Sequence, residues 1–209
     1  MNIESLPLVI PIFPLDGALL LPKGNLPLNI FEPRYIQMLD YSMKNEKMIG
    51  MIQINQKSKK TNGLYTTGCL GKITQYNETD DGRYMINLSG VIRFHFVKEE
   101  KTNEKFRKLT VDYSAFKNDI TSNFKTTIDN KEFLNEVKNY LAKNDIKVNW
   151  SAIDNIDQTV LITSLASICP FSIAEKQMIL ESPDIKTIPE RMLSLFKMSY
   201  TGTAEERIN

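Results

Sequence analysis

Two side chains in the sequence could in principle do nucleophilic chemistry together. Cys69 carries a thiol, and His95 is the one histidine among the 209 residues and could act as its base. Such a pair must meet in space, which separation in sequence does not forbid. No local signature of the pair surrounds either residue, and the run 68–71 fits a tight strand entry equally well. We therefore interpret Cys69 as a small buried side chain and His95 as an ordinary strand residue.

Metal and phosphate chemistry are not indicated either. A zinc site needs several cysteines or histidines at ligand spacing, and the sequence has neither CxxC nor HExxH. The run Gly68–Lys72 resembles a phosphate-binding loop only superficially, because the GxxxxGK[ST] loop must lead into a helix and this run continues as a strand. Asp80 and Asp81 fit a turn, and Asp154 and Asp157 fit a helix N-terminus. We predict no catalytic residue, no metal and no cofactor.

Charge and composition exclude several classes of protein. Twenty-six basic residues face twenty-five acidic ones, so no overall field attracts a polyanion, which argues against a nucleic-acid partner. A basic cluster between residues 98 and 108 is interleaved with glutamates and is interpreted as a solvated loop. Two isolated cysteines do not make a secreted disulfide framework. With no signal peptide and no apolar run of about 18 residues, we expect a cytoplasmic protein without a membrane partner.

The first half of the chain has the pattern of strands and turns. Strands are expected near residues 8–12, 48–54, 68–76, 83–89, 91–97 and 109–116, with a polar loop over 56–63. A helix is expected over 32–44, with Pro33 in its first turn. Gly82 ends a hairpin turn, and Gly90 between two strand patterns suggests a bulge or a bend that closes a barrel.

The second half changes to helical spacing. Phe133, Val137, Tyr140 and Leu141 share one helical face, and a second helix is expected to bury Val160, Leu161, Ser164, Leu165 and Ile168. Capping boxes are expected at Ser172 with Glu175 and at Thr187 with Glu190. The polar stretch 118–129 separates the halves. We therefore predict an α+β chain with a β-rich domain over 1–117 and an α-helical bundle over 118–209.

Ordered blocks in the first hundred residues resemble the Lon N-terminal, or substrate-binding, domain family. The blocks are Leu6–Leu8, Ile12–Leu15, Leu21–Pro22, Leu26–Tyr35, Ile49–Gln53, Leu64–Ile73, Asp81–Tyr84 and Leu88–Phe94. The helical half is similar to standalone members of the family at Trp150 and over 175–181. The resemblance implies a PUA-like pseudo-β-barrel followed by a helical bundle, which agrees with the pattern of strands and helices.

The resemblance also implies a function. A full Lon protease continues into an ATPase module with a Walker A loop and then a serine–lysine peptidase, and these 209 residues contain neither. We therefore expect a standalone, non-catalytic interaction module that binds unfolded or extended polypeptide, or a protease or chaperone partner. An RNA-binding role is the alternative, since PUA-like folds host RNA readers. A small-molecule enzyme using Cys69 or His95 is a third possibility.

The residues of the shared blocks divide into two groups. Asn29, Phe31, Glu32, Arg34 and Tyr35 are expected to rim a groove, in which an exposed aromatic beside a guanidinium and an amide grips extended peptide, while an open strand edge could add peptide as a further strand. The others are interpreted as scaffold, with backbone permissiveness at the glycines and carboxylate partners for two arginines on adjacent strands. They are Pro14, Pro22, Pro27, Pro33, Gly68, Cys69, Gly71, Gly82, Arg83, Gly90 and Arg93.

Overall fold

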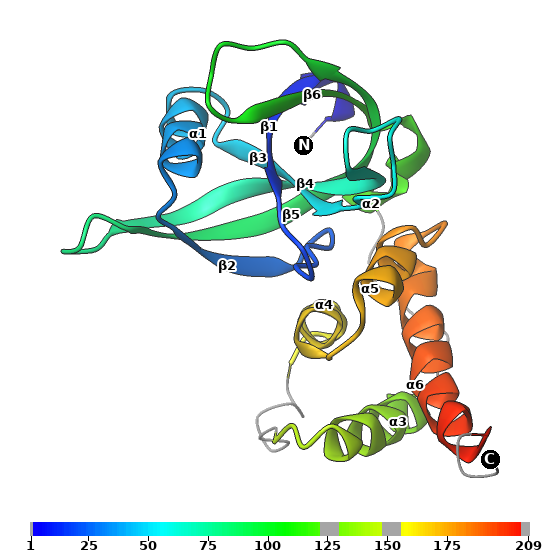
Figure 1. Cartoon of the computed structure of the whole chain (residues 1–209). Coiled ribbons are helices and arrows are strands. Elements are labelled where there is room, and N and C mark those ends of the chain that lie inside the picture. The colour runs from blue at the N-terminus through cyan, green and yellow to red at the C-terminus, as the bar shows by residue number, and fades with distance from the viewer. Residues whose placement is uncertain (1, 122–129, 148–155, 206–209) are drawn as a thin grey trace.

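The structure is a computed structural model that describes residues 2–121, 130–147 and 156–205, with the backbone alone at 130 and 200–205. A strand-rich half precedes a helical half, so the predicted α+β class is confirmed (Figure 1). The strands are β1 (Val9–Pro14), β2 (Asn25–Ile30), β3 (Met48–Ile54), β4 (Leu64–Glu78), β5 (Tyr84–Glu100) and β6 (Arg107–Asp112). The helices are α1 (Pro33–Lys44), α2 (Asn118–Thr121), α3 (Asn130–Lys143), α4 (Gln158–Ile168), α5 (Ile173–Leu180) and α6 (Ile188–Glu205). Short 3₁₀ turns are η1 (Ile3–Ser5), η2 (Ser114–Phe116) and η4 (Ile185–Thr187).

The sheet closes on itself as a near-barrel. Its strand order is β2-β5-β4-β3-β1-β6, and β6 also pairs with β5. The long strand β5 makes both connections: residues 84–89 pair with β2, and residues 95–100 pair with β6. β1 and β3 are parallel, and the other pairs are antiparallel. Five strands therefore form a ring, and β2 lies outside it as an edge strand.

The structure corrects the prediction for the first half of the chain at three places. The two strands expected over 83–89 and 91–97 are one continuous strand, β5, with the predicted bulge where Val91 has no partner between Gly90 and Ile92. A bulge bends a strand and increases its twist, which lets β5 pass from β2 to β6. β2 was not predicted at all. The basic cluster predicted as a loop instead contributes residues 98–100 to β5 and 107–108 to β6.

Three of the four motif glycines are required by space rather than by backbone angle. Among the four motif glycines Gly68, Gly71, Gly82 and Gly90, only Gly82 has a positive φ, of 75°, in the turn before β5. A Cβ at Gly90 would lie 2.0 Å from the carbonyl oxygen of Leu21, and one at Gly68 would lie 2.4 Å from the ring of Phe94. Gly71 is crowded by a Leu20 methyl in the same way. The predicted role in backbone permissiveness is therefore right for Gly82 and wrong for the other three.

Two clusters of buried apolar side chains make up the core. One draws on all five ring strands and fills the ring, with Ile10, Ile52, Leu70, Phe94 and Leu109 among its members. The other lies between the sheet and the helices and includes Leu19, Leu88, Val137, Leu165 and Phe196. Because the second cluster contains side chains from both halves of the chain, the helices complete the core of the sheet.

The helical half agrees with most of the predicted faces. The four predicted residues of α3 are buried, and the capping box of Ser172 with Glu175 is present at α5. Asp157 caps α4 through a hydrogen bond from the amide of Thr159, whereas Asp154 and Trp150 lie outside the described residues. The Thr187 hydroxyl donates to the carbonyl of Asp184, and the described residues show no hydrogen bond between Thr187 and Glu190 for the predicted box.

The predicted face of α4 is right for Leu165 and for the partly buried Leu161, and wrong for the other three residues. Val160, Ser164 and Ile168 are exposed, and the buried residues are Ile162, Thr163, Leu165 and Ala166. This helix is apolar on more than one side, so periodicity alone did not fix which side packs against the sheet. Over the residues that the structure describes, no helix combines the length and apolar character needed to cross a membrane.

A buried ion pair joins the two halves. The Arg93 guanidinium on β5 donates to both carboxylate oxygens of Asp119 on α2, at 2.8 Å and 2.7 Å, and both side chains are almost completely buried. It also donates to the carbonyls of Leu180 and Ser182, at the end of α5. A carboxylate partner was predicted for Arg93, and the structure identifies it as Asp119.

Candidate functional site

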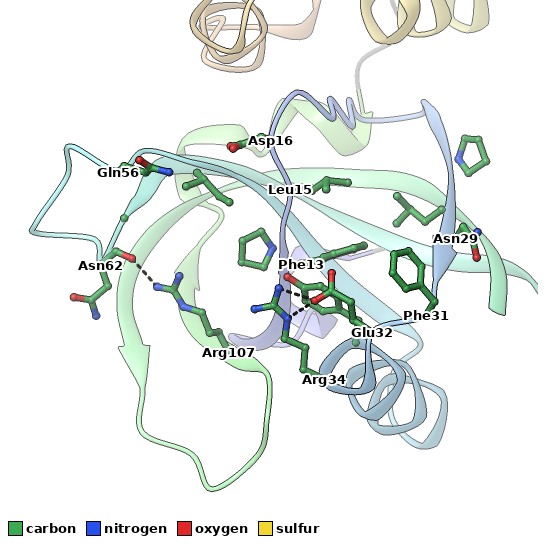
Figure 2. A pocket seen from close by; sticks show the side chains of 16 residues that line it. Phe13, Leu15, Asp16, Asn29, Phe31, Glu32, Arg34, Gln56, Asn62 and Arg107 are labelled. Atoms are coloured by element: carbon green, nitrogen blue, oxygen red, sulfur yellow. Dashed lines mark hydrogen bonds and ion pairs between the residues drawn. The ribbon is translucent and has the colours of Figure 1, made fainter. Parts of the chain in front are cut away.

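A pocket of about 680 Å³ opens beside the ring, between the ends of β1 and β3, the edge strand β2 and the start of α1. Figure 2 shows Asn29 and Phe31 on one side of it, and Asn62 and Arg107 on the opposite side. Phe13 lies between these two sides. The strand ends and the helix start thus bring residues from four parts of the chain to one cavity.

The floor of the pocket is aromatic. The rings of Phe13 and Tyr35 lie 4.2 Å apart between centroids, and each side chain is only 7% exposed. Burial raises the pKa of the Tyr35 phenol, so this group stays neutral at physiological pH. Phe31 differs, because 57% of it is exposed at the rim. An exposed aromatic side chain above a buried aromatic pair offers apolar contact to a ligand.

Both arginines of the rim are already paired with carboxylates. Arg34 donates to Glu32 at 2.9 Å, and its guanidinium lies 4.5 Å from the centre of the Tyr35 ring. Across the pocket, Arg107 makes two hydrogen bonds to Glu99, at 2.6 Å and 2.8 Å, and a third to the carbonyl of Asn62. The lining holds two arginines and two carboxylates, Asp16 and Glu32, so its formal charge is zero.

Local sequence explains how the rim is built. Pro33 occupies the first turn of α1, where its missing N–H costs no hydrogen bond, and it ends the extended chain that follows β2. The helix therefore starts immediately after Phe31 and Glu32. This short junction turns Arg34 and Tyr35 back towards the end of β1, where Tyr35 meets Phe13.

Cys69 and His95 have separate surroundings on neighbouring strands. Cys69 is completely buried opposite Arg93, and burial raises the pKa of its thiol. His95 lies opposite Thr67, with its Nδ1 3.2 Å from the Thr67 hydroxyl, and packs on the ring of Phe116. A buried thiol with a raised pKa is a poor nucleophile. The described residues contain no cluster of three or more potential metal ligands.

Comparison with known proteins identifies the family. Residues 9–197 match the model of the ATP-dependent protease La (LON) substrate-binding domain. The chain belongs to this family. The N-terminal domain of Lon from the Mycobacterium avium complex aligns with 90% of this chain and 95% of that one, with a TM-score of 0.59 and 14% identity. A Lon N-terminal domain protein from Xanthomonas campestris has the same TM-score, covers 89% of this chain and 97% of that one, and is 18% identical.

Similar full-length proteins are proteases that are much longer than this substrate-binding domain. Lon protease of Cytophaga hutchinsonii is 28% identical over 88% of this chain, and Lon protease 1 of Bacillus subtilis is 26% identical over 88%. The alignments cover 23% and 24% of those proteins. The chain therefore spans about a quarter of their length.

All five residues predicted to rim a groove line the pocket of this Lon domain: Asn29, Phe31, Glu32, Arg34 and Tyr35. Pro14 and Pro27, predicted as scaffold, line it as well. Pro22 is buried beside Gly90, and Pro33 starts α1. Arg83 pairs with Asp81 at 2.9 Å, as predicted. It lies in the turn just before β5, however, so Arg83 and Arg93 are not on adjacent strands.

The sequence did not indicate the far side of the pocket. Its missed residues include Phe13, Leu15, Asp16, Gln56, Asn62 and Arg107. Arg107 was interpreted as a member of a solvated basic cluster. Its separation from Glu99 in the sequence does not indicate that the two side chains pair, because they meet only once β5 and β6 are paired. Phe13 belongs to the block Ile12–Leu15 that resembles the Lon family, and its aromatic side chain was the one feature that could have indicated a place in the pocket.

Proposed function

We propose that this Lon substrate-binding domain binds unfolded or extended polypeptide in the pocket between β2 and α1, without chemistry of its own. The observation that carries the proposal is the pairing of an exposed aromatic, Phe31, with the buried Phe13–Tyr35 floor in a lining of zero formal charge. Apolar side chains exposed by an unfolded chain match such a lining. The alternative partner, a protease or a chaperone, would use the same surface.

The polar rim supports a polypeptide ligand over a purely apolar one. Asn29, Gln56 and Asn62 line the pocket with amide groups, which can donate to and accept from a peptide backbone. Arg34 and Arg107 are held by carboxylates, so neither is a bare cation that would select for an acidic ligand. Apolar contact would supply the affinity, and the side-chain amides would orient the bound peptide.

The test is fluorescence anisotropy of labelled, reduced and carboxymethylated α-lactalbumin titrated with the protein at low and high salt. We expect saturable binding that changes little with salt, because the lining has no net charge. Phe31→Ala should weaken binding by about 1–2 kcal/mol, the usual cost of truncating an aromatic anchor at an interface. Arg34→Ala and Tyr35→Ala should also weaken it.

Leu8→Ala is the matched control, since Leu8 is 63% exposed and does not line the pocket. Its affinity should equal that of the wild type. Unchanged affinity in folded Arg34→Ala and Tyr35→Ala proteins would show that polypeptide does not bind in this pocket. A structured RNA titrated in parallel tests the nucleic-acid alternative, for which steep salt dependence is the signature.

A further inference from the structure

The edge strand β2 has one side without a partner strand. Its inner side pairs with β5 from Asn25 to Ile30, and it is the terminal strand of the sheet. Within the described residues, no strand other than β5 pairs with β2. An unpaired strand side presents a row of backbone donors and acceptors that another extended chain can match.

The register shows which residues point their backbone groups outwards. The Gly90 amide donates to the Gly24 carbonyl at 2.8 Å, just before the paired residues Asn25 and Ser89. In an antiparallel pair, bonded and non-bonded residues alternate. Leu26, Leu28 and Ile30 therefore bond to β5, while the amides of Asn25 and Asn29 and the carbonyls of Asn25, Pro27 and Asn29 face away from it.

The two ends of this outer side differ in surroundings. At the Asn25 end, α4 packs close to the strand, where a Cβ at Gly24 would lie 3.1 Å from the Cβ of Thr163. At the other end, Pro27, Asn29 and Phe31 line the pocket (Figure 2). The Asn25 end of the outer side thus lies near α4, and the part from Pro27 onwards lies beside the aromatic floor.

We propose that an extended polypeptide pairs with residues 27–31 of β2 as an added strand and places one large uncharged side chain in the pocket. This inference rests on the proposed function of the pocket and specifies how the ligand is held. Asn29 supplies one amide and one carbonyl, and Pro27 supplies a carbonyl. Alternate side chains of a strand point to the same face, so a side chain at every second position can reach the lining.

Two features favour this ligand. Backbone amides and carbonyls spaced as in a strand are matched by extended peptide, whatever its sequence, which suits a domain that receives varied unfolded chains. The zero formal charge of the lining and its buried aromatic floor select an aromatic or large aliphatic side chain. Pro27 removes one donor from the outer side, which keeps the pairing short and opposes the continuous addition of strands.

The experiment uses an acetylated nine-residue peptide in which threonine and valine alternate around a central phenylalanine, so that one large side chain fixes the register. Single N-methyl groups are placed in turn on the backbone amides around the phenylalanine, and dissociation constants are measured by anisotropy. We expect losses of about tenfold at every second amide and changes within about twofold at the amides between them. A uniform profile would overturn strand addition.

Two protein variants test the β2 backbone groups that would form hydrogen bonds with the peptide. Asn29→Pro removes the outward amide beside the pocket and should weaken the unmethylated peptide about tenfold. Asn25→Pro removes the equivalent amide at the end near α4 and should leave the affinity within about twofold. Equal affinities of the two variants, with folds verified by circular dichroism, would also overturn the inference.

The outcomes separate this inference from the proposed function. Peptide binding that is lost in Phe31→Ala but insensitive to N-methylation would keep the pocket as the site and reject strand addition. No binding of either the peptide or carboxymethylated α-lactalbumin would reject both.

Discussion

Arg93 is a charged side chain in the interior whose partners come from α2 and from the end of α5. Removing a charged group from water costs free energy, and here two carboxylate hydrogen bonds and two carbonyls compensate for it. The ring of Phe116 packs 4.4 Å from the guanidinium carbon and completes the enclosure. Arg93 therefore acts as a structural link between the sheet and the helices.

Asp119→Ala is predicted to destabilise the protein by about 3–5 kcal/mol, because it leaves the Arg93 charge buried without its counterion. Urea unfolding monitored by circular dichroism measures the change. Asp81→Ala is the control, since it removes the exposed partner of Arg83 and should leave the urea midpoint where it is. A wild-type midpoint for Asp119→Ala would show that the buried pair has no such role.

The blocks shared with the Lon family and their residue types predicted one side of the pocket and not the other. Asn29 to Tyr35 are consecutive, so their proximity needed no tertiary information. Arg107 reaches the pocket because β6 pairs with the distal part of β5, and Asn62 because the loop between β3 and β4 contacts Glu99 and Arg107. The partner of Arg93 was equally hidden, since Asp119 lies 26 residues away in a short helix that has no periodic pattern.

At the scale of elements, the close crossing of the chain at Gly90 positions β2. The amide and carbonyl of Gly90 bond to Gly24 and Lys23, while the Leu21 carbonyl occupies the space where a Cβ would be. This crossing holds the segment before β2 against β5 at its bulge. The strand that carries the proposed docking side thus depends on one glycine.

Gly90→Ala is predicted to destabilise the protein by about 1–3 kcal/mol, and by more if the backbone at Leu21 cannot move, because the new methyl overlaps a carbonyl. It should also weaken polypeptide binding by displacing β2. Thermal unfolding and anisotropy measure the two effects. The neighbouring change Ser89→Ala adds no atoms and should alter stability by no more than about 0.5 kcal/mol. If Gly90→Ala changed stability and binding as little as Ser89→Ala, the close crossing at Gly90 would not be what positions β2.

Some elements could be predicted from the sequence and others could not. α1 and β3 were predicted within one residue, because apolar spacing and Pro33 mark their bounds. β2 was missed although Leu26, Leu28 and Ile30 alternate with its other residues, because proline and asparagine are uncommon in strands and Pro27 argues against a strand in the interior of a sheet. The predicted buried face of α4 included three exposed residues, because apolar residues surround much of that helix and periodicity does not single out one side.

At the scale of the molecule, the shared apolar cluster ties the two predicted domains, 1–117 and 118–209, to each other. Leu19 to Leu21 pack in the same cluster as α3, α4 and α6 residues. The Ser167 hydroxyl donates to the Leu19 carbonyl at 3.1 Å, and the Lys176 ammonium donates to the Gly17 carbonyl at 2.6 Å. We propose that the division near residue 118 separates two subdomains of one cooperative unit.

Cooperative unfolding of the whole domain is the resulting prediction. Native-state hydrogen exchange in rising urea should show that amides of β5 and of α3 lose protection with the same free energy of opening, because neither half keeps its core without the other. Asp119→Ala, which cuts a link between the halves, should lower both free energies together. Loss of protection in α3 at lower urea than in β5 would instead identify the helices as an independent domain, and the barrel with its pocket should then bind polypeptide alone.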